Sequence, residues 1–257
     1  MKTKPEILMI NGDERQKYMY EYLLKENFNV ILKNNYDNKK YESIILPINY
    51  ENIDEIISIA NKTPIFAGRI PAKSYELAKN LNVELYDYFE NEEVKYKNAI
   101  LTAEAAIAIA INDYKKSLRD SNCLIIGFGR IGKILLRYLE NFTHSICISA
   151  RKEKDFSYIK ALGFDFCHTE IIKNAFKYNI IFNTVPHLVI NENVVKNLNK
   201  ETYIIDLASA PGGTDFMKAT ELDIKFNHAL ALPGKYSPVS AGEILGASVS
   251  RIIKERS

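Results

Sequence analysis

Ser121–Gly132 reads SNCLIIGFGRIG, and this stretch decides the fold of the chain. A short apolar run, typical of a buried strand, is followed by three glycines in G-x-G-x-x-G spacing, and a helical periodicity begins directly behind them. In such a pattern Gly127 permits a tight turn, Gly129 lets the backbone approach a pyrophosphate, and Gly132 lets the helix pack against the strand. The stretch therefore predicts a dinucleotide-binding turn, with the phosphates at the helix N-terminus.

The composition is that of an ordinary soluble globular protein, because 47% of the 257 residues are hydrophobic and 26% are charged. This length allows one large or two medium domains. A net charge of +2 provides no basic face for nucleic acid. The longest apolar run, Ala105–Ile111, is too short to span a membrane, and no signal-peptide pattern opens the chain. Three cysteines without C-x-x-C spacing and four scattered histidines predict reduced thiols, no metal site and a cytoplasmic location.

Strands alternate with helices along both halves of the chain, which predicts an α/β fold of two doubly wound parallel-sheet domains. We expect a flavodoxin-like domain on the substrate side over residues 1–97 and an alanine-rich connector helix over residues 98–117. A Rossmann NAD(P)-binding domain follows over residues 118–235, with its last strand at Leu230–Leu232. A C-terminal helix over residues 236–257 is expected to return to the first domain, so that it and the connector helix bridge the two domains.

The second strand of the Rossmann domain ends at Ser149, and Arg151 and Lys152 follow it. Enzymes that use NAD usually place an acidic residue here, where it holds the ribose 2′-hydroxyl. A basic tip suits a 2′-phosphate instead, so the sequence favours NADP over NAD. The alternative is a solvated basic turn, with Glu153 or Asp155 reaching back.

Two later strands of this domain end in small, polar, proline-bearing loops that would flank a nicotinamide ring. Together with the glycine turn and the basic tip, they complete the predicted cofactor site. Its residues are Gly127, Phe128, Gly129, Arg130, Ile131, Gly132, Ser149, Arg151, Lys152, Asn183, Thr184, Val185, Pro186, Leu207 and Ala208.

The N-terminal half also carries polar residues at strand ends. Asp13 follows the first strand, where it either caps the next helix or contacts a ligand. Arg15 and Arg69 each follow a predicted strand, and ligands of open α/β sheets bind at the carboxyl ends of strands. Glu104, inside the apolar connector helix, is either a partner of the helix dipole or a cleft residue.

With these residues identified, the chain resembles the A subunits of dipicolinate synthases from spore-forming bacteria along its whole length. The most specific pieces are Gly12–Gln16, Gly127–Gly132, Asn183–Pro186, Asp206–Phe216, Leu232–Gly234 and Ser240–Gly242. The chain departs from the family at Leu101–Ala105, where LTAEA stands in place of PTVEG, and at His187, where a serine is more usual.

The resemblance implies the NAD(P)-linked oxidation of dihydrodipicolinate, or of its 4-hydroxy-tetrahydro precursor, to dipicolinate during sporulation. It also implies a homo-oligomer within a heteromeric complex whose smaller B subunit is flavoprotein-like. The dicarboxylate substrate calls for guanidinium or ammonium groups, and its oxidation needs a hydride acceptor and a base.

The candidate residues for this chemistry fall into two groups. The catalytic candidates are Glu104, Asp206, Ser209 and Lys235; the substrate-binding candidates are Asp13, Arg15, Arg69, Thr102, Thr214 and Asp215. Glu104 and Asp206 are alternative bases, Ser209, Thr214 and His187 are alternative positioning groups, and Lys235 is also a candidate for holding a carboxylate.

Two other functions stay open at this point. One is another two-domain NAD(P)-dependent dehydrogenase that acts on a hydroxy or amino acid. The other is a nucleotide-binding protein without chemistry of its own that serves a partner, because the sequence shows no obvious catalytic His–carboxylate pair.

Overall fold

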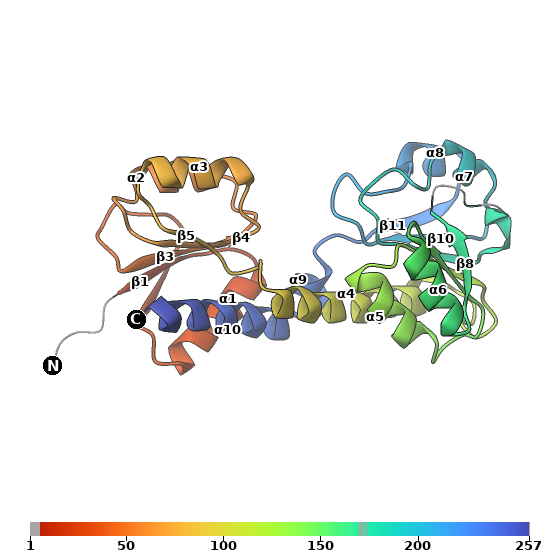
Figure 1. Cartoon of the computed structure of the whole chain (residues 1–257), viewed down its shortest axis with the longest axis horizontal. Helices are drawn as coiled ribbons and strands as arrows, with labels where there is room; N and C mark the ends of the chain where they lie inside the picture. The colour runs from red at the N-terminus through yellow and green to blue at the C-terminus, as the bar shows by residue number, and fades with distance from the viewer. Residues whose placement is uncertain (1–5, 170–171, 173, 257) are drawn as a thin grey trace. The chain divides into compact units, whose positions relative to one another are not determined.

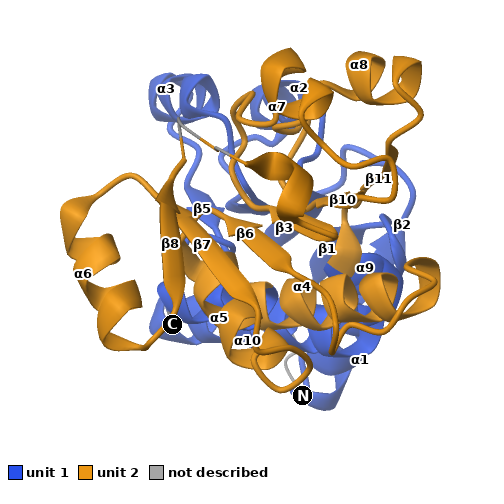
Figure 2. Cartoon of the chain, turned by 90° about the vertical axis from the view of Figure 1, so that its right-hand side faces the viewer, with its two compact units in different colours: residues 1–98, 233–257 blue, residues 99–232 orange. Residues whose placement is uncertain are grey.

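The computed structural model describes residues 6–169, 172 and 174–256. The chain divides into two compact units, residues 1–98 with 233–257 and residues 99–232, which Figure 2 colours separately. Each unit is built on one parallel sheet, and this confirms the predicted fold class of two parallel-sheet α/β domains.

The first unit has the strand order β2-β1-β3-β4-β5, and every pairing in it is parallel. The strands are β1 (Ile7–Ile10), β2 (Val30–Lys33), β3 (Ser43–Ile48), β4 (Ile65–Gly68) and β5 (Leu85–Asp87). Helices α2 (Ile53–Ile59) and α3 (Ala72–Asn80) cover one face, and α1 (Glu14–Lys25) and α10 (Pro238–Arg256) cover the other (Figure 1). Because both faces are covered, β1 and β4 are buried along their whole length.

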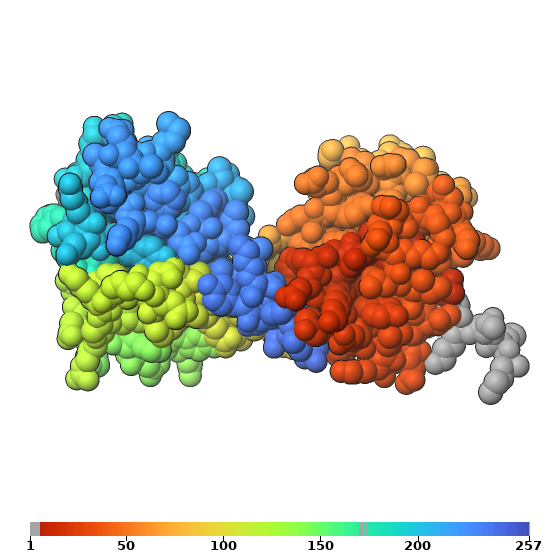
Figure 3. Space-filling view, turned by 180° about the vertical axis from the view of Figure 1, so that it is seen from behind, coloured from red at the N-terminus to blue at the C-terminus, as the bar shows by residue number. Residues whose placement is uncertain are grey.

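Helices α1 and α10 pack closely in this unit. A side chain at Gly242 of α10 would overlap Tyr18 and the backbone of α1, so the small residue permits the approach. Leu245 and Val249 of α10 join Met19 and Leu23 of α1 in one apolar cluster. In the space-filling view the blue C-terminal segment lies against the red N-terminal residues, in keeping with the packing of α10 on α1 (Figure 3).

The second unit has the strand order β11-β10-β9-β6-β7-β8, again all parallel. Counted from β6, this is the Rossmann order 3-2-1-4-5-6. The strands are β6 (Cys123–Ile126), β7 (Ile146–Ala150), β8 (Asp165–His168), β9 (Ile180–Asn183), β10 (Tyr203–Asp206) and β11 (Lys225–His228). Helices α4 (Glu92–Asp113), α5 (Arg130–Leu139) and α6 (Glu153–Ala161) share one apolar cluster with the sheet; α7 (Glu192–Lys196) and α8 (Phe216–Glu221) join the cluster of the opposite face.

Two predicted helices have different bounds. The helix expected over residues 98–117 is α4, which already begins at Glu92, because the Asn91 side chain accepts a hydrogen bond of 2.8 Å from the Glu93 amide and caps it. The C-terminal helix expected over residues 236–257 is preceded by a short helix, α9 (Leu232–Tyr236), and begins as α10 at Pro238. The sequence pattern also favours a helix over residues 171–177. Residue 171 lies outside the described residues, and the described part of this segment contains a 3-10 turn at Ala175–Lys177.

The strand predicted at Leu230–Leu232 is wrong. The last strand is β11, Lys225–His228, whose alternating polar residues do not resemble a buried strand. It forms the edge of the sheet and is partly exposed, so these residues are tolerated there. In the part of the chain that the structure describes, no helix is long and apolar enough to cross a membrane.

Candidate functional site

In each sheet the strand order reverses at one point, between β1 and β3 in the first unit and between β6 and β9 in the second. Ligands of open α/β sheets bind outside the carboxyl ends of the strands at such a point. The glycine turn follows β6 directly, and the loop that begins with Gly12 follows β1. The two candidate sites are therefore the carboxyl edges of the two sheets.

The glycine turn has the geometry that a dinucleotide requires. Gly127 adopts a positive φ of 97°, and a side chain there would overlap Thr184, whose hydroxyl donates a 2.9 Å hydrogen bond to the Ile126 carbonyl. A side chain at Gly132 would overlap the carbonyl of Gly127. Gly129, in contrast, has open space within 4 Å of the position that a Cβ would take. Two glycines thus serve packing, and the third leaves room for a ligand.

The N-terminus of α5 offers donors to that open space. Gly129 is the N-cap residue, and no side chain caps the helix. The first amides of a helix have no acceptor within the helix, and they attract anions together with the positive end of the helix dipole. The glycine turn therefore has the uncapped helix start and the open space that the predicted pyrophosphate site needs.

The basic tip of β7 differs from the prediction at one residue. Ser149 has no exposed surface, and its hydroxyl lies 3.0 Å from the Thr169 hydroxyl. It is therefore committed to the sheet interior and cannot reach a ribose phosphate. Arg151 and Lys152 are exposed, and neither side chain has an ion-pair or hydrogen-bond partner in the described chain.

Asp206, at the end of β10, accepts four hydrogen bonds. It is completely buried. One carboxylate oxygen accepts from the Asn183 amide at 2.9 Å and the Ala208 N–H at 3.1 Å; the other accepts from the Gly213 N–H at 2.9 Å and the Thr214 hydroxyl at 2.7 Å. Four donors occupy the carboxylate, so it anchors the loop after β10 and has no free lone pair for a substrate proton.

Several neighbouring candidates also serve this loop. Asn183 additionally bonds both polar groups of Val185, by accepting from its N–H and donating to its carbonyl. Thr214 donates to Asp206, and Asp215 caps α8 by accepting from the Lys218 amide at 3.0 Å. The remaining loop residues divide by exposure: Leu207 and Ala208 are buried, whereas Pro186, His187 and Ser209 are exposed.

Glu104 lies away from the glycine turn. Its exposed carboxylate lies near Tyr138, close to the C-terminal end of α5, and the partial burial of Tyr138 and the charge of Glu104 both raise the pKa of Tyr138. Since α5 starts at the glycine turn, Tyr138 is roughly 12 Å along the helix from it. Thr102, on the same helix as Glu104, is buried.

In the first unit, Asp13 and Arg15 form a compact pair at the start of α1. Asp13 caps the helix by accepting from the Arg15 amide at 3.0 Å, and its carboxylate also binds the Arg15 guanidinium through Nε at 2.9 Å and through Nη2. Asp13 therefore caps the helix, as one of its two predicted roles requires, and also holds the Arg15 side chain in place. Lys235, on α9, is exposed and has no hydrogen-bond or ion-pair partner among the described residues.

Arg69, at the end of β4, lies close enough to Arg15 to be affected by its charge. Partial burial and the Arg15 guanidinium both lower the pKa of Arg69, while Asp87 opposes them. The Arg69 side chain lies over the Phe89 ring at 4.7 Å. The carboxylate of Asp87 accepts from the backbone amides of Arg69, Ile70 and Phe89, so it is already engaged. Arg69 has no acidic side chain paired with its guanidinium in the described chain and lies near the charge of Arg15, so this edge attracts an anion.

The sequence reasoning missed Asp87, which shapes the loop that carries Arg69. It missed two further groups. The amide nitrogen of Gln16 and Nε2 of His228 are buried without a hydrogen-bond partner in the described chain. Asp87 and His228 each directly end a strand, β5 and β11, and this position was the available signal.

The fold and the glycine turn define a class, the two-domain dehydrogenase fold. The structure of D-lactate dehydrogenase from Escherichia coli superposes with a TM-score of 0.76 at 12% identity, covering 97% of each chain. Identity this low shows the fold alone.

Within this class the chain is similar over its full length to the A subunit of dipicolinate synthase. The Bacillus subtilis (strain 168) protein is 28% identical and is matched over 99% of this chain and 98% of its own. The crystal structure of the Bacillus halodurans protein has a TM-score of 0.87 at 25% identity, over 98% of this chain and 99% of its own. That of the Bacillus subtilis protein has a TM-score of 0.85 at 26% identity, over 99% and 97%. No family model matches the chain. The resemblance to the A subunits of dipicolinate synthases is confirmed.

Proposed function

We propose that this chain carries out the NAD(P)-linked oxidation of dihydrodipicolinate, or of 4-hydroxy-tetrahydrodipicolinate, to dipicolinate as the A subunit of a dipicolinate synthase. The observation that carries the proposal is the similarity to the Bacillus subtilis A subunit over 99% of this chain and 98% of that protein. The two carboxyl edges support it, because one suits a dinucleotide and the other suits an anion. We further propose that the complex is cytoplasmic, acts in sporulation and contains a flavoprotein-like B subunit.

The cofactor side of the proposal rests on the glycine turn and the basic tip. A bound nicotinamide ring accepts the hydride that leaves the substrate. The residues of this chain bind and orient it: the N-terminus of α5 holds the pyrophosphate, and Arg151 and Lys152 hold a 2′-phosphate. Because both of these cations lack a partner in the described chain, NADP is the proposed cofactor.

The substrate side rests on Arg15 and Arg69. A guanidinium binds a carboxylate through two parallel hydrogen bonds. Asp13 already binds Nε and Nη2 of Arg15, so Nη1 of Arg15 remains for a ligand. The Arg69 guanidinium has no hydrogen-bond or ion-pair partner in the described chain, so it can bind a carboxylate through two nitrogens. We propose that these two arginines hold the carboxylates of the substrate.

The proposed reaction also needs a residue that accepts a proton from the substrate. When dihydrodipicolinate becomes aromatic, it loses one hydride and one proton. Asp206 is occupied by four donors, and Glu104 lies beside Tyr138, away from the glycine turn, so neither is proposed as the base. Ser209 and Lys235 keep exposed side chains without a partner in the described chain, and they remain the proposed proton-transfer candidates.

Because neither Asp206 nor Glu104 is proposed as the base, a second candidate function is favoured. In this function the chain binds the nucleotide and the substrate, and the partner protein supplies the base.

One experiment tests both functions. Purified chain is mixed with freshly generated dihydrodipicolinate and either NADP or NAD, with and without the B subunit, while reduced nicotinamide and dipicolinate are followed together. Coupled formation of both by the chain alone supports the first function. Formation only with the partner supports the second, and neither product under any condition rejects both.

The cofactor choice is tested by Arg151→Ala. Losing one charge-assisted contact to a 2′-phosphate should weaken NADP binding about tenfold and leave NAD binding nearly unchanged. Lys154→Ala is the matched control, because Lys154 is an exposed cation at the start of α6 without a partner in the described chain. Equal weakening of both cofactors in the Arg151 variant contradicts the NADP assignment.

A further inference from the structure

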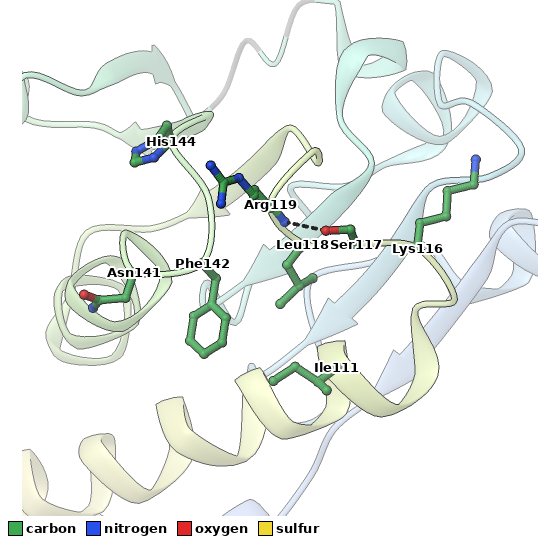
Figure 4. Close-up of a pocket in the computed structure, with 8 residues that line it drawn as sticks. All are labelled: Ile111, Lys116, Ser117, Leu118, Arg119, Asn141, Phe142 and His144. Carbon is green, nitrogen blue, oxygen red and sulfur yellow. Dashed lines mark hydrogen bonds between the residues drawn. The ribbon is translucent and has the colours of Figure 1, made fainter.

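A pocket lies at the amino edge of the sheet in the second unit, opposite the carboxyl edge that carries the glycine turn. It has a volume of about 500 Å³ and lies among the end of α4, the loop that leads into β6 and the loop that leads into β7 (Figure 4). Parallel strands start at this edge, whereas the glycine turn lies where they end. The pocket is therefore separate from the proposed cofactor site of the same unit.

The lower part of the pocket is apolar. Ile111 and Phe142 are 52% and 40% exposed, and both line it together with the buried Leu118. Single exposed apolar side chains are common on protein surfaces and need no explanation. Here two exposed apolar side chains, Ile111 and Phe142, line the same pocket, and its volume is within the range of small-molecule sites.

The ionisable side chains that line the pocket are all basic. Its lining includes Lys116, Arg119 and His144 and contains no acidic residue. Lys116 is paired with Glu201 at 2.5 Å. The Arg119 guanidinium and the His144 imidazole have no partner in the described chain, although the Arg119 backbone amide donates to the Ser117 hydroxyl at 3.2 Å. Figure 4 shows both side chains on the same side of Phe142.

We infer that this pocket binds a small amphipathic anion, a flat apolar group that carries a carboxylate. The apolar body would cover Phe142 and Ile111 and remove their exposed surface from water. The carboxylate would lie against the Arg119 guanidinium, which can bind it with two parallel hydrogen bonds. His144 adds a second donor on the same side. The inference does not depend on the proposed oxidation, because it uses none of the residues of the carboxyl edge.

The test is a titration of the full-length chain with 2-naphthoate, followed by amide chemical shifts and by calorimetry. The uncharged 2-naphthamide is the matched ligand, because it keeps the shape and loses the charge. We expect naphthoate to shift the resonances of residues 111, 118 and 142 and to bind about tenfold more tightly than the amide. Inorganic phosphate alone should bind more weakly than naphthoate.

Two variants locate the contacts. Arg119→Gln should weaken naphthoate binding about tenfold and leave naphthamide binding unchanged, and Phe142→Ala should weaken both. Arg137→Gln, at an exposed arginine of α5 outside the pocket, is the control and should bind like the original chain. Equal affinity for naphthoate and naphthamide, an unaffected Arg119 variant, phosphate that binds as tightly as naphthoate, or no binding of naphthoate would each overturn the inference.

Discussion

The substitution Asp206→Asn separates an anchoring carboxylate from a catalytic one. The amide keeps the shape of the side chain and replaces one acceptor oxygen by a donor group. The orientation of lowest energy points the new NH₂ group at Thr214, because the Thr214 hydroxyl can rotate and accept a hydrogen bond. The Gly213 N–H then loses its acceptor. One buried unsatisfied donor costs about 1–3 kcal/mol, and the remaining bonds weaken because the charge is gone. We expect a total loss of about 2–4 kcal/mol.

For a unit of this size, such a loss should lower the melting temperature by roughly 5–15 °C. The assay combines thermal unfolding with hydrogen exchange of the Ala208 and Gly213 amides, which should lose protection first. Asp215→Asn is the matched control, because asparagine caps a helix as well as aspartate does. If the Asp206 variant is as stable and as protected as the control but catalytically inactive, Asp206 is the base and the anchoring argument fails.

Two further predictions use the glycine turn and a surface ion pair. Gly129→Ala should leave stability nearly unchanged and weaken cofactor binding by about tenfold or more, whereas Gly132→Ala should destabilise the chain by about 1–3 kcal/mol, since its side chain meets the carbonyl of Gly127. Melting curves and cofactor titration measure both effects, and equal stability of the two variants would refute the assignment. In the first unit, the Lys33 hydrogen bond lowers the pKa of Asp37 from 3.8 to about 2. A lowered folded-state pKa stabilises the folded chain at pH values above the ordinary pKa of 3.8, and this contribution shrinks as pH falls from there towards 2. The stability difference between the original chain and Asp37→Asn should therefore be constant well above pH 3.8 and decrease progressively down to about pH 2. Urea titrations across this range check the sign.

The sequence predicted the parts of the fold that depend on local pattern. The strand before Gly127 and the helix behind it form as expected, because an apolar run, a glycine turn and a helical period specify one supersecondary unit. The start of α4 was missed although Asn91 followed by two glutamates is a helix-start signal. The edge strand β11 was missed because half-exposed strands tolerate polar residues.

Side-chain roles were less predictable than elements, and Ser149 shows why. It lies in a strand that is buried on both faces, so the alternation that tells inside from outside is missing from the sequence. Its direction became clear only from the Thr169 hydroxyl beside it. The role of Asp206 is likewise invisible in the sequence, because its four donors come from β9 and from the loop after β10.

Asp206–Phe216, the most specific part of the resemblance, therefore contains a residue that holds a loop in place, Asp206, rather than one with a free catalytic group at that position. Its buried carboxylate fixes the loop that follows β10, and Asn183 ties this loop to the exit of β9 beside the glycine turn. A loop held by four donors to one carboxylate is rigid, and under the proposed function it would serve to position a ring for hydride transfer. The residue that does the proton chemistry has a different requirement, since it needs a free lone pair at the moment of reaction. Among the catalytic candidates, the exposed Ser209 hydroxyl keeps its lone pairs, whereas the carboxylate of the buried Asp206 is fully engaged.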